Sequence, residues 1–296
     1  MAEEKLSGVF APVTTPFEAD DVRYDWLAEN LEKLGRSGLK GYLALGSNGE
    51  FMSLTPQEQL EVLRVFAECK GDKTVMAGTA RESTRETIEF SRQAAETGVD
   101  FVSVLTPHYF ARRTTDDVLI RYYTEVADNV PVPVLLYNAP GFAGGVQLSP
   151  AVVRELAAHP NIVGMKDSSP SGMNSYLSAT RDNDAFQVLA GSASFFYTAL
   201  VCGAAGGVVS LANCLPGECC KLYEAFVRGD PRQAQRLHFR LIALNKAVSG
   251  RAGVAGVKAA MDLMGYRGGA PRRPFLPLDE AGRQAIREAL EKEGVL

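Results

Sequence analysis

One lysine stands at the polar end of a short apolar run in the middle of the chain. Residues 162–165 follow a turn-like segment that ends at Asn161, and Lys166 comes directly after them. This pattern predicts a buried strand that ends at the rim of a sheet, with the lysine where the strand meets its loop. A lysine amine in such a place can attack a ketone and form a Schiff base. A structural lysine paired with Asp167 or with a helix C-terminus is the alternative interpretation.

A tyrosine ends the preceding run of the same kind, at residues 132–137. If the two runs are neighbouring strands, the phenol of Tyr137 lies near Lys166 and can carry protons during imine formation. A rim tyrosine that is hydrogen-bonded to the backbone is the alternative. The two residues together favour acid–base chemistry on a covalent lysine adduct.

The segment Gly46-Ser47-Asn48-Gly49 follows another apolar run. Its glycines permit unusual backbone angles, and the hydroxyl and successive amide N–H groups between them can hold a carboxylate. A simple turn is one alternative. A phosphate site is another, because the Gly- and Ser-rich residues 191–194 follow a later run, but the chain has no GxxxxGK[ST] loop to support it.

Short apolar runs like those that carry these residues recur along the chain at regular spacing. There are eight of them, at residues 9–13, 42–45, 74–77, 101–105, 132–137, 162–166, 186–190 and 207–211. Helix signals separate them: Thr55-Pro56 with Glu58 supplies an N-cap, a first-turn proline and a capping box, and Ser149-Pro150 opens another helix. Eight repeated βα units predict an α/β fold, a closed (β/α)8 TIM barrel.

Four further helical segments follow the last run, at residues 216–228, 231–248, 254–264 and 280–293. The barrel needs only the first of them. We therefore expect a catalytic barrel over residues 1–230 and a three-helix C-terminal extension over residues 231–296, packed on the barrel.

In such barrels the chemistry lies at the C-terminal ends of the strands. Thr14 follows the first run, and Tyr109 follows the fourth. The nearby Pro107 suggests that the Tyr109 loop bends away from the barrel mouth, where the tyrosine can serve a partner subunit. Arg112 and Arg113, in the same loop, fit a solvated position.

The overall composition limits the kinds of partner. A net charge of −4 with 22% charged residues gives no basic stripe for nucleic acid and no polybasic cluster for a membrane. The chain starts without a secretory pattern and has no apolar run of about 18 residues, so we expect a cytoplasmic protein that acts on a small molecule. Its five cysteines and three histidines lack metal-site spacing, and we expect no metal.

Taken together, the strand ends resemble those of the dihydrodipicolinate synthase/N-acetylneuraminate lyase family of pyruvate-handling barrels. The segment Gly46-Ser47-Asn48-Gly49-Glu50 looks like the family's GxxGE loop, Tyr137-Asn138-Ala139-Pro140 resembles its YNxP segment, and residues 161–166 resemble its NIxGxK lysine strand. The resemblance covers nearly the whole chain, including the helical extension. Each motif is weak alone, and the three together are highly specific.

The resemblance implies a role for several residues. It makes Lys166 the Schiff-base nucleophile and Tyr137 the proton shuttle, with no external cofactor. It makes Tyr109 a residue that enters a neighbouring subunit's site in a homotetramer built as a dimer of dimers. Further residues are implied to bind or line the pocket for a small 2-oxo acid: Gly46, Ser47, Asn48, Thr14, Ser168, Val208 and Ser210. The Ser-Asn loop and the tripeptide Lys166-Asp167-Ser168 look most like those of 4-hydroxy-2-oxoglutarate aldolases.

One position departs from the family pattern. Dihydrodipicolinate synthases usually carry an arginine two residues after the YNxP proline, and here that residue is Phe142. A phenyl ring cannot replace the charge-assisted fork that grips a second carboxylate, unless Arg112 or Arg113 compensates. We therefore expect a class I aldolase that resembles 4-hydroxy-2-oxoglutarate aldolase. Dihydrodipicolinate synthase, a sugar-acid lyase or dehydratase, a metal-dependent class II aldolase and a non-catalytic 2-oxo-acid-binding regulator are the alternatives.

Overall fold

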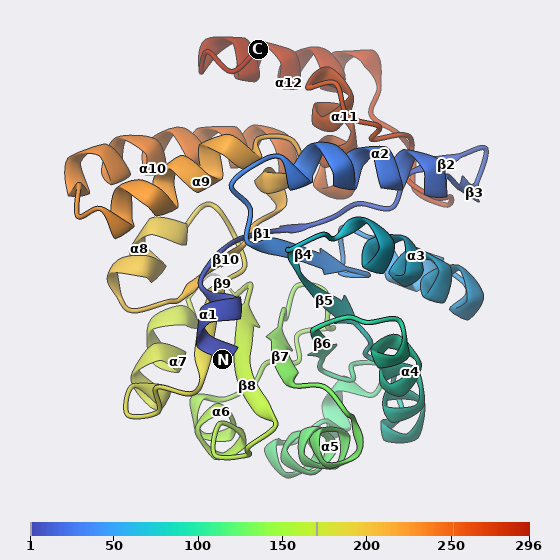
Figure 1. The fold of residues 1–296 in the computed structure, drawn as a ribbon, viewed down its shortest axis with the longest axis vertical. Helices are drawn as coiled ribbons and strands as arrows, with labels where there is room; N and C mark the ends of the chain where they lie inside the picture. Colours follow the sequence, from blue (N-terminus) through green and yellow to red (C-terminus); the bar gives the residue numbers. More distant parts are fainter. Residues whose placement is uncertain (1, 170, 251) are drawn as a thin grey trace.

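Eight parallel strands close into a barrel in the computed structural model, which describes residues 2–169, 171–250 and 252–296 (Figure 1). Around the barrel the order is β1-β10-β9-β8-β7-β6-β5-β4, and β4 pairs with β1 to close it. The strands are β1 (Gly8–Pro12), β4 (Gly41–Ala44), β5 (Thr74–Gly78), β6 (Phe101–Leu105), β7 (Val134–Asn138), β8 (Ile162–Asp167), β9 (Gln187–Ala190) and β10 (Gly206–Val208). The predicted TIM barrel is confirmed, with a strand at each of the eight predicted runs.

Helices surround the barrel and alternate with its strands (Figure 1). Thr55 caps α3 with the predicted capping box, and Ser149 caps α6 by accepting a hydrogen bond from the Val152 amide. These helices are α2 (Tyr24–Gly35), α3 (Pro56–Cys69), α4 (Thr84–Glu96), α5 (Asp116–Asn129), α6 (Pro150–Leu156), α7 (Met173–Thr180), α8 (Phe196–Val201) and α9 (Pro216–Val227).

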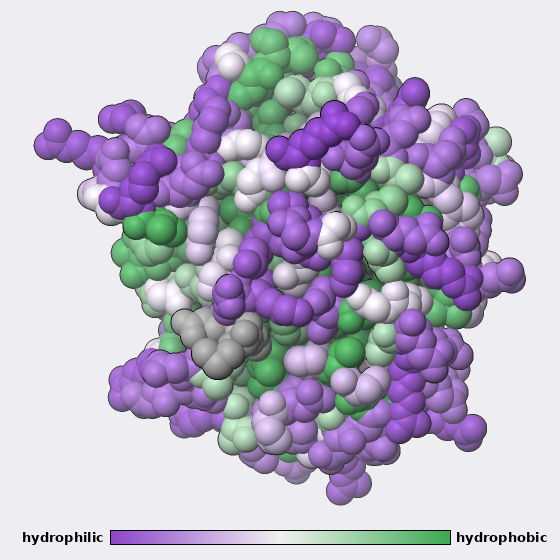
Figure 2. Space-filling view, in the orientation of Figure 1, coloured by the Kyte–Doolittle hydropathy of each residue, from purple (hydrophilic) through white to green (hydrophobic). Residues whose placement is uncertain are grey.

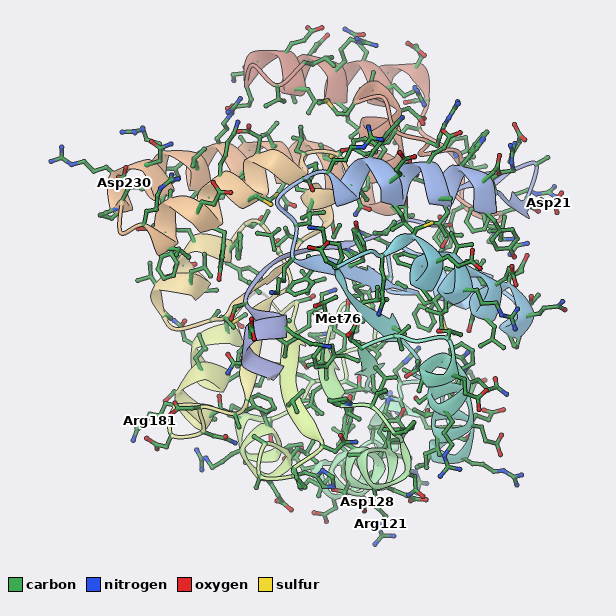
Figure 3. The ribbon with its side chains drawn as sticks, in the orientation of Figure 1. Asp21, Met76, Arg121, Asp128, Arg181 and Asp230 are labelled. Carbon is green, nitrogen blue, oxygen red and sulfur yellow. The ribbon has the colours of Figure 1, made fainter. Side chains whose placement is uncertain are left out.

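The barrel interior is filled by a separate cluster of apolar side chains. Alternate residues of the strands point inward, so that Phe10 and Met76 belong to this cluster while their neighbours pack against the helices. Leu6, from the short helix α1 (Ala2–Leu6), joins the cluster. Figure 3 shows Met76 among the strands, whereas the labelled charged residues lie at the outer edge. Figure 2 shows that the face around α1 is mainly hydrophilic. A filled barrel leaves room for a ligand only beyond the strand ends.

Three helices follow the barrel, and the predicted helical extension is therefore confirmed. They are α10 (Pro231–Asn245), α11 (Gly253–Leu263) and α12 (Glu280–Lys292). In Figure 1, α10 lies alongside α9, and α11 and α12 lie beyond α2. Arg240 of α10 pairs with Glu218 of α9 at 2.7 Å, which ties the extension to the barrel helices. The division of the chain at residue 230 remains a prediction.

The structure corrects several local expectations. The helix expected over 231–248 ends at Asn245 and continues as the π-helical segment η4 (Lys246–Gly250). The sequence predicts a last strand that reaches residue 211, but β10 ends at Val208 and the 3-10 turn η3 (Ser210–Asn213) takes the chain away from the sheet. A hairpin of β2 (Phe17–Glu18) and β3 (Asp21–Val22) had no clear sequence signal.

Candidate active site

A cavity of about 700 Å³ lies at the C-terminal ends of the strands. Lys166, Tyr137, Ser47 and Asn48 line one side of it. Residues of the C-terminal extension line another side, and they come from Asn245 at the end of α10, from the η4 segment, from the start of α11 and from residues 271–276. Of the predicted pocket residues, Phe142, Ser168 and Ser210 also line it.

Lys166 and Tyr137 face each other from adjacent strands. They are paired in the parallel register of β7 and β8. The Lys166 Nζ atom lies 4.3 Å from the centroid of the Tyr137 ring, and both residues are buried at 6% and 5% exposure. Register alone therefore brings the amine and the phenol together, as the sequence predicted.

The Tyr137 phenol lies among groups that favour its ionised form. Burial raises its pKa, but the neighbouring Lys166 charge and hydrogen bonds with Ser47, Ser168 and Lys166 outweigh burial, so the pKa lies below its ordinary value. The Ser47 Oγ and Tyr137 Oη atoms are 3.4 Å apart. A phenol with a lowered pKa exchanges protons more readily near neutral pH, as a proton shuttle requires.

The turn after β4 presents Ser47 and Asn48 to the cavity. The Glu50 amide donates to the Ser47 carbonyl at 3.1 Å, and the Thr15 hydroxyl donates to the Gly49 carbonyl at 2.8 Å, so both ends of the turn are held. Within the described chain, the buried Asn48 Nδ2 has no hydrogen-bond partner. An unpartnered amide donor that lines the same cavity as the Lys166 amine is suited to hold the carboxylate of a bound 2-oxo acid.

A buried polar network lies behind Tyr137 and Lys166, and the sequence did not reveal it. Asn138 Nδ2 donates to Asp167 Oδ1 at 2.8 Å, and the Leu148 amide donates to Asn138 Oδ1 at 3.0 Å. The Ser169 amide and hydroxyl both donate to the same Asp167 oxygen. Burial raises the pKa of the Asp167 carboxyl. The network fixes the loops that follow Tyr137 and Lys166.

Ser168 reaches the cavity because a neighbouring residue has no side chain. A Cβ added at Gly191 would lie 2.1 Å from the Ser168 Oγ atom. The glycine that suggested a phosphate loop is therefore needed to make room for this hydroxyl. Gly46 does not line the main cavity and instead borders a much smaller one beneath the turn.

Other predicted site residues lie away from the cavity. Thr14 is fully buried, and its hydroxyl donates to the Met261 sulfur at 3.2 Å. Val208 belongs to the apolar cluster inside the barrel. Tyr109 is 78% exposed, and it does not line the cavity of its own chain. Arg112 and Arg113 lie in the 3-10 turn η2 (Ala111–Arg113), also outside the cavity.

Sequence reasoning missed a histidine and most of the C-terminal wall. His108 lines the cavity, and its Nδ1 lies 3.1 Å from Glu82 Oε1. The Glu82 carboxylate also accepts hydrogen bonds from the His108 and Tyr109 amides. Where it is described, the C-terminal wall is small or apolar apart from Asn245, as at Val254 and Phe275. Its residues form no motif, so only the fold places them at the site.

No group of three or more metal-ligating side chains occurs among the residues that the structure describes. In the same part of the chain, no helix is long and apolar enough to cross a bilayer.

The fold and this site are those of barrel enzymes that make or break carbon–carbon bonds. Two solved structures share the whole fold. One is YagE of Escherichia coli K12, a prophage protein of the dihydrodipicolinic acid synthase family in complex with pyruvate, with a TM-score of 0.91, 30% identity, and coverage of 98% of this chain and 99% of that one. The other is dihydrodipicolinate synthase from Aquifex aeolicus, with a TM-score of 0.91, 28% identity, and coverage of 98% of each chain.

The chain belongs to the dihydrodipicolinate synthetase family, whose model matches residues 5–293. A 4-hydroxy-tetrahydrodipicolinate synthase of Methanoculleus marisnigri is 34% identical over 98% of this chain and 100% of its own length. A Coccidioides immitis protein provisionally named 4-hydroxy-2-oxoglutarate aldolase, mitochondrial, is 32% identical over 96% of this chain and 94% of its own length. The protein is therefore a pyruvate-dependent carbon–carbon lyase, as the sequence motifs predicted.

Proposed function

We propose that this enzyme is a class I aldolase that cleaves or forms a 4-hydroxy-2-oxo acid, with 4-hydroxy-2-oxoglutarate as its preferred substrate. The single observation that carries this proposal is Phe142, which lines the cavity where a dihydrodipicolinate synthase usually places an arginine. The Coccidioides immitis relative is consistent with the same activity.

In the proposed mechanism, Lys166 attacks the C2 ketone and loses water to give a protonated imine. The imine accepts the electron pair of the C3–C4 bond as that bond breaks. The C4 hydroxyl gives up its proton as the aldehyde leaves, and an enamine remains on Lys166. Protonation of C3 and hydrolysis then release pyruvate and regenerate the amine. No external cofactor takes part in these steps.

Tyr137 carries the protons, since its phenol lies beside the amine and its pKa is lowered. Ser47 and Asn48 hold the carboxylate next to the ketone. Such contacts fix the orientation of the reacting carbons and also balance charge.

The far end of the substrate meets a different set of groups. Ser168 and His108 line the cavity, and His108 is the only described lining residue besides Lys166 that can carry a positive charge. Asn138 is turned toward Asp167 and Leu148, so it does not serve this end. We expect hydroxyl and imidazole contacts to hold a short aldehyde acid such as glyoxylate.

The test compares two substrates in two enzymes. The measurement is kcat/KM for cleavage of 4-hydroxy-2-oxoglutarate and for condensation of pyruvate with aspartate semialdehyde, in wild type and in Phe142→Arg. Wild type should favour the cleavage. The variant should improve aspartate semialdehyde use by about 10- to 100-fold, because a hydrogen bond to a charged group contributes about 1.5 to 3 kcal/mol. Phe142→Lys is the matched control, since it adds the charge without the bidentate fork.

Dihydrodipicolinate synthase is the second candidate, favoured by the names of several relatives, including that of Methanoculleus marisnigri. Efficient condensation with aspartate semialdehyde by the wild type would put this activity first. It would also mean that a group other than residue 142 grips the second carboxylate.

We also propose that the enzyme works as a homotetramer in which Tyr109 enters a neighbour's site. The exposed Tyr109 and Phe110 rings, at 78% and 70%, support this proposal because large exposed apolar groups mark contact surfaces. Mixing and refolding Lys166→Ala with Tyr109→Phe subunits should restore part of the activity. Mixed oligomers with no regained activity would show that each site is self-contained.

A further inference from the structure

A buried ion pair joins the end of the Ser47-Asn48 turn to the C-terminal extension. Glu50, the residue after the Ser47-Asn48-Gly49 turn, has its Oε1 atom 2.6 Å from the Lys258 Nζ atom of α11. The two side chains are only 4% and 0% exposed. Glu50 also has a positive φ of 52°, so its backbone is held in a region that non-glycine residues seldom occupy.

The remaining contacts of the pair lie in the C-terminal extension and, at Phe17, in β2. Lys258 Nζ donates to the Ala270 carbonyl at 2.9 Å and lies 4.4 Å from the centroid of the Phe17 ring. The Arg272 amide donates to Glu50 Oε2 at 2.9 Å. The extension therefore contacts both carboxylate oxygens of Glu50, Oε2 through a hydrogen bond and Oε1 through the ion pair alone. Glu50 itself lines the cavity.

A second ion pair fixes the following helix to the same segment. The Arg272 guanidinium donates to both Glu58 carboxylate oxygens, at 2.7 and 2.8 Å, and to the Ser53 carbonyl at 2.9 Å. The extension therefore grips the chain on both sides of the 3-10 turn η1 (Phe51–Ser53). Neither Lys258 nor Arg272 lines the cavity, so neither can act on the substrate directly.

The energetics argue against a purely stabilising role for the Lys258–Glu50 pair. Burial lowers the pKa of Lys258 from 10.5 to about 8, although the Glu50 carboxylate raises it. Burial therefore disfavours the charged lysine more than its partner stabilises it. Buried ion pairs of this kind are weak contributors to stability, and apolar replacements are often as stable. The pair is therefore better explained by the position in which it holds Glu50 than by a gain in stability.

We propose that Lys258 is a positioning residue, which acts through Glu50 to hold the Ser47-Asn48 turn where the carboxylate of a Lys166-bound 2-oxo acid needs it. This inference rests on the proposed role of that turn in binding pyruvate. On this inference the C-terminal extension does more than line the cavity, because it also positions a group that binds the substrate.

The probe is pyruvate itself, trapped on the enzyme by borohydride and quantified by mass at the peptide containing Lys166. The enzymes are wild type, Lys258→Met, Glu50→Gln and the double variant Lys258→Met/Glu50→Gln. The double variant matters most, because a single change leaves one buried charge without its partner and can prevent folding. The matched control is Arg240→Met, which breaks another partly buried ion pair of the extension, at a residue that does not line the cavity.

We expect the double variant to melt near the wild-type temperature and to need about tenfold more pyruvate for half-maximal trapping, which corresponds to about 1.4 kcal/mol. Trapping of methyl pyruvate, which has no anionic carboxylate, should change much less. The Arg240→Met control should lower the melting temperature and leave the pyruvate requirement unchanged.

Two results overturn the inference. One is a double variant with the wild-type pyruvate requirement, and the other is an equal loss for pyruvate and methyl pyruvate, which would indicate a general structural effect. If wild type itself forms no adduct at Lys166, the proposed function fails instead, and the two failures are therefore distinguishable.

Discussion

The cavity has two walls, and they differ in how the chain builds them. The barrel wall carries Tyr137, Lys166 and the Ser47-Asn48 turn, each at the end of a strand and each within a local motif. The lining residues of the C-terminal wall come from the end of α10, from η4, from the start of α11 and from the segment 271–276. Where they are described they are small or apolar apart from Asn245, and they form no motif. In the proposed mechanism the reactive groups thus come from the barrel wall, whereas the C-terminal wall gives the cavity its shape. Through Lys258, the extension also holds part of the opposite wall in place.

The largest effect that tests this difference between the two walls is expected when the Lys166 amine is removed. Lys166→Ala should abolish turnover, because no other described lysine lines the cavity to replace the nucleophile. Pyruvate with borohydride should add a reduced pyruvyl mass to the peptide containing residue 166 in wild type and none in the variant. Lys258→Met/Glu50→Gln, which also lacks a buried lysine, should still be labelled at Lys166. An adduct on a lysine of the C-terminal extension would reverse the roles of the two walls.

The next largest effect concerns the phenol. Tyr137→Phe should slow turnover by about 10² to 10⁴, since a positioned proton carrier contributes that much. The control is Tyr123→Phe, whose buried hydroxyl donates to the Val104 carbonyl at 3.0 Å and lies outside the cavity. That control should reduce stability and leave kcat close to the wild-type value. An unchanged rate in Tyr137→Phe would remove the proton-carrier role.

The same contrast shows what the sequence could predict. The eight strands could be predicted because each is a short apolar run. Tyr137 and Lys166 could then be placed together because, in a barrel, consecutive strands pair side by side and both residues stand at the C-terminal end of their strand. The prediction that Thr14 lines the pocket was wrong. The direction of a side chain just after a strand depends on its tertiary partners, and those of Thr14 are Asn213 and Met261. His108 and the wall at Val254 lie in the cavity through contacts between distant segments. No local pattern encodes such contacts.

A smaller effect is expected from the network behind the barrel wall. Asn138→Ala removes the donor to Asp167 and the acceptor for the Leu148 amide, so the loops after β7 and β8 lose a shared anchor. We expect kcat to fall about tenfold, in line with the roughly 1 to 3 kcal/mol lost when buried polar partners are removed. Asp167→Asn is the matched control, because its retained Oδ1 still accepts from Asn138 and Ser169. Equal losses in both variants would point to the charge of Asp167 rather than to the anchor.

The smallest effect is on stability and concerns the link between the two walls. The pKa of Lys258 is about 8 in the folded protein and 10.5 when unperturbed, and the charged groups acting on it are Glu50 and Asp262. Between these two values the unfolded chain binds more protons than the folded chain, so stability from this residue rises with pH across that window. The contribution of Lys258 to the free energy of unfolding is greatest above pH 10.5, decreases as the pH falls from 10.5, and is lost as the pH falls through about 8.

The measurement is the melting temperature of wild type minus that of Lys258→Met/Glu50→Gln, followed from pH 7.5 to 10.5. Subtracting the double variant cancels the groups that titrate in both proteins, so the difference should rise by a few degrees with pH. Over the same range the wild type should need more pyruvate for trapping relative to methyl pyruvate, because an uncharged Lys258 holds Glu50 less firmly. Stability and pyruvate binding would then move in opposite directions with one deprotonation. A constant melting difference would mean that Lys258 keeps its proton, and that the extension holds the turn by packing and the Arg272 amide alone.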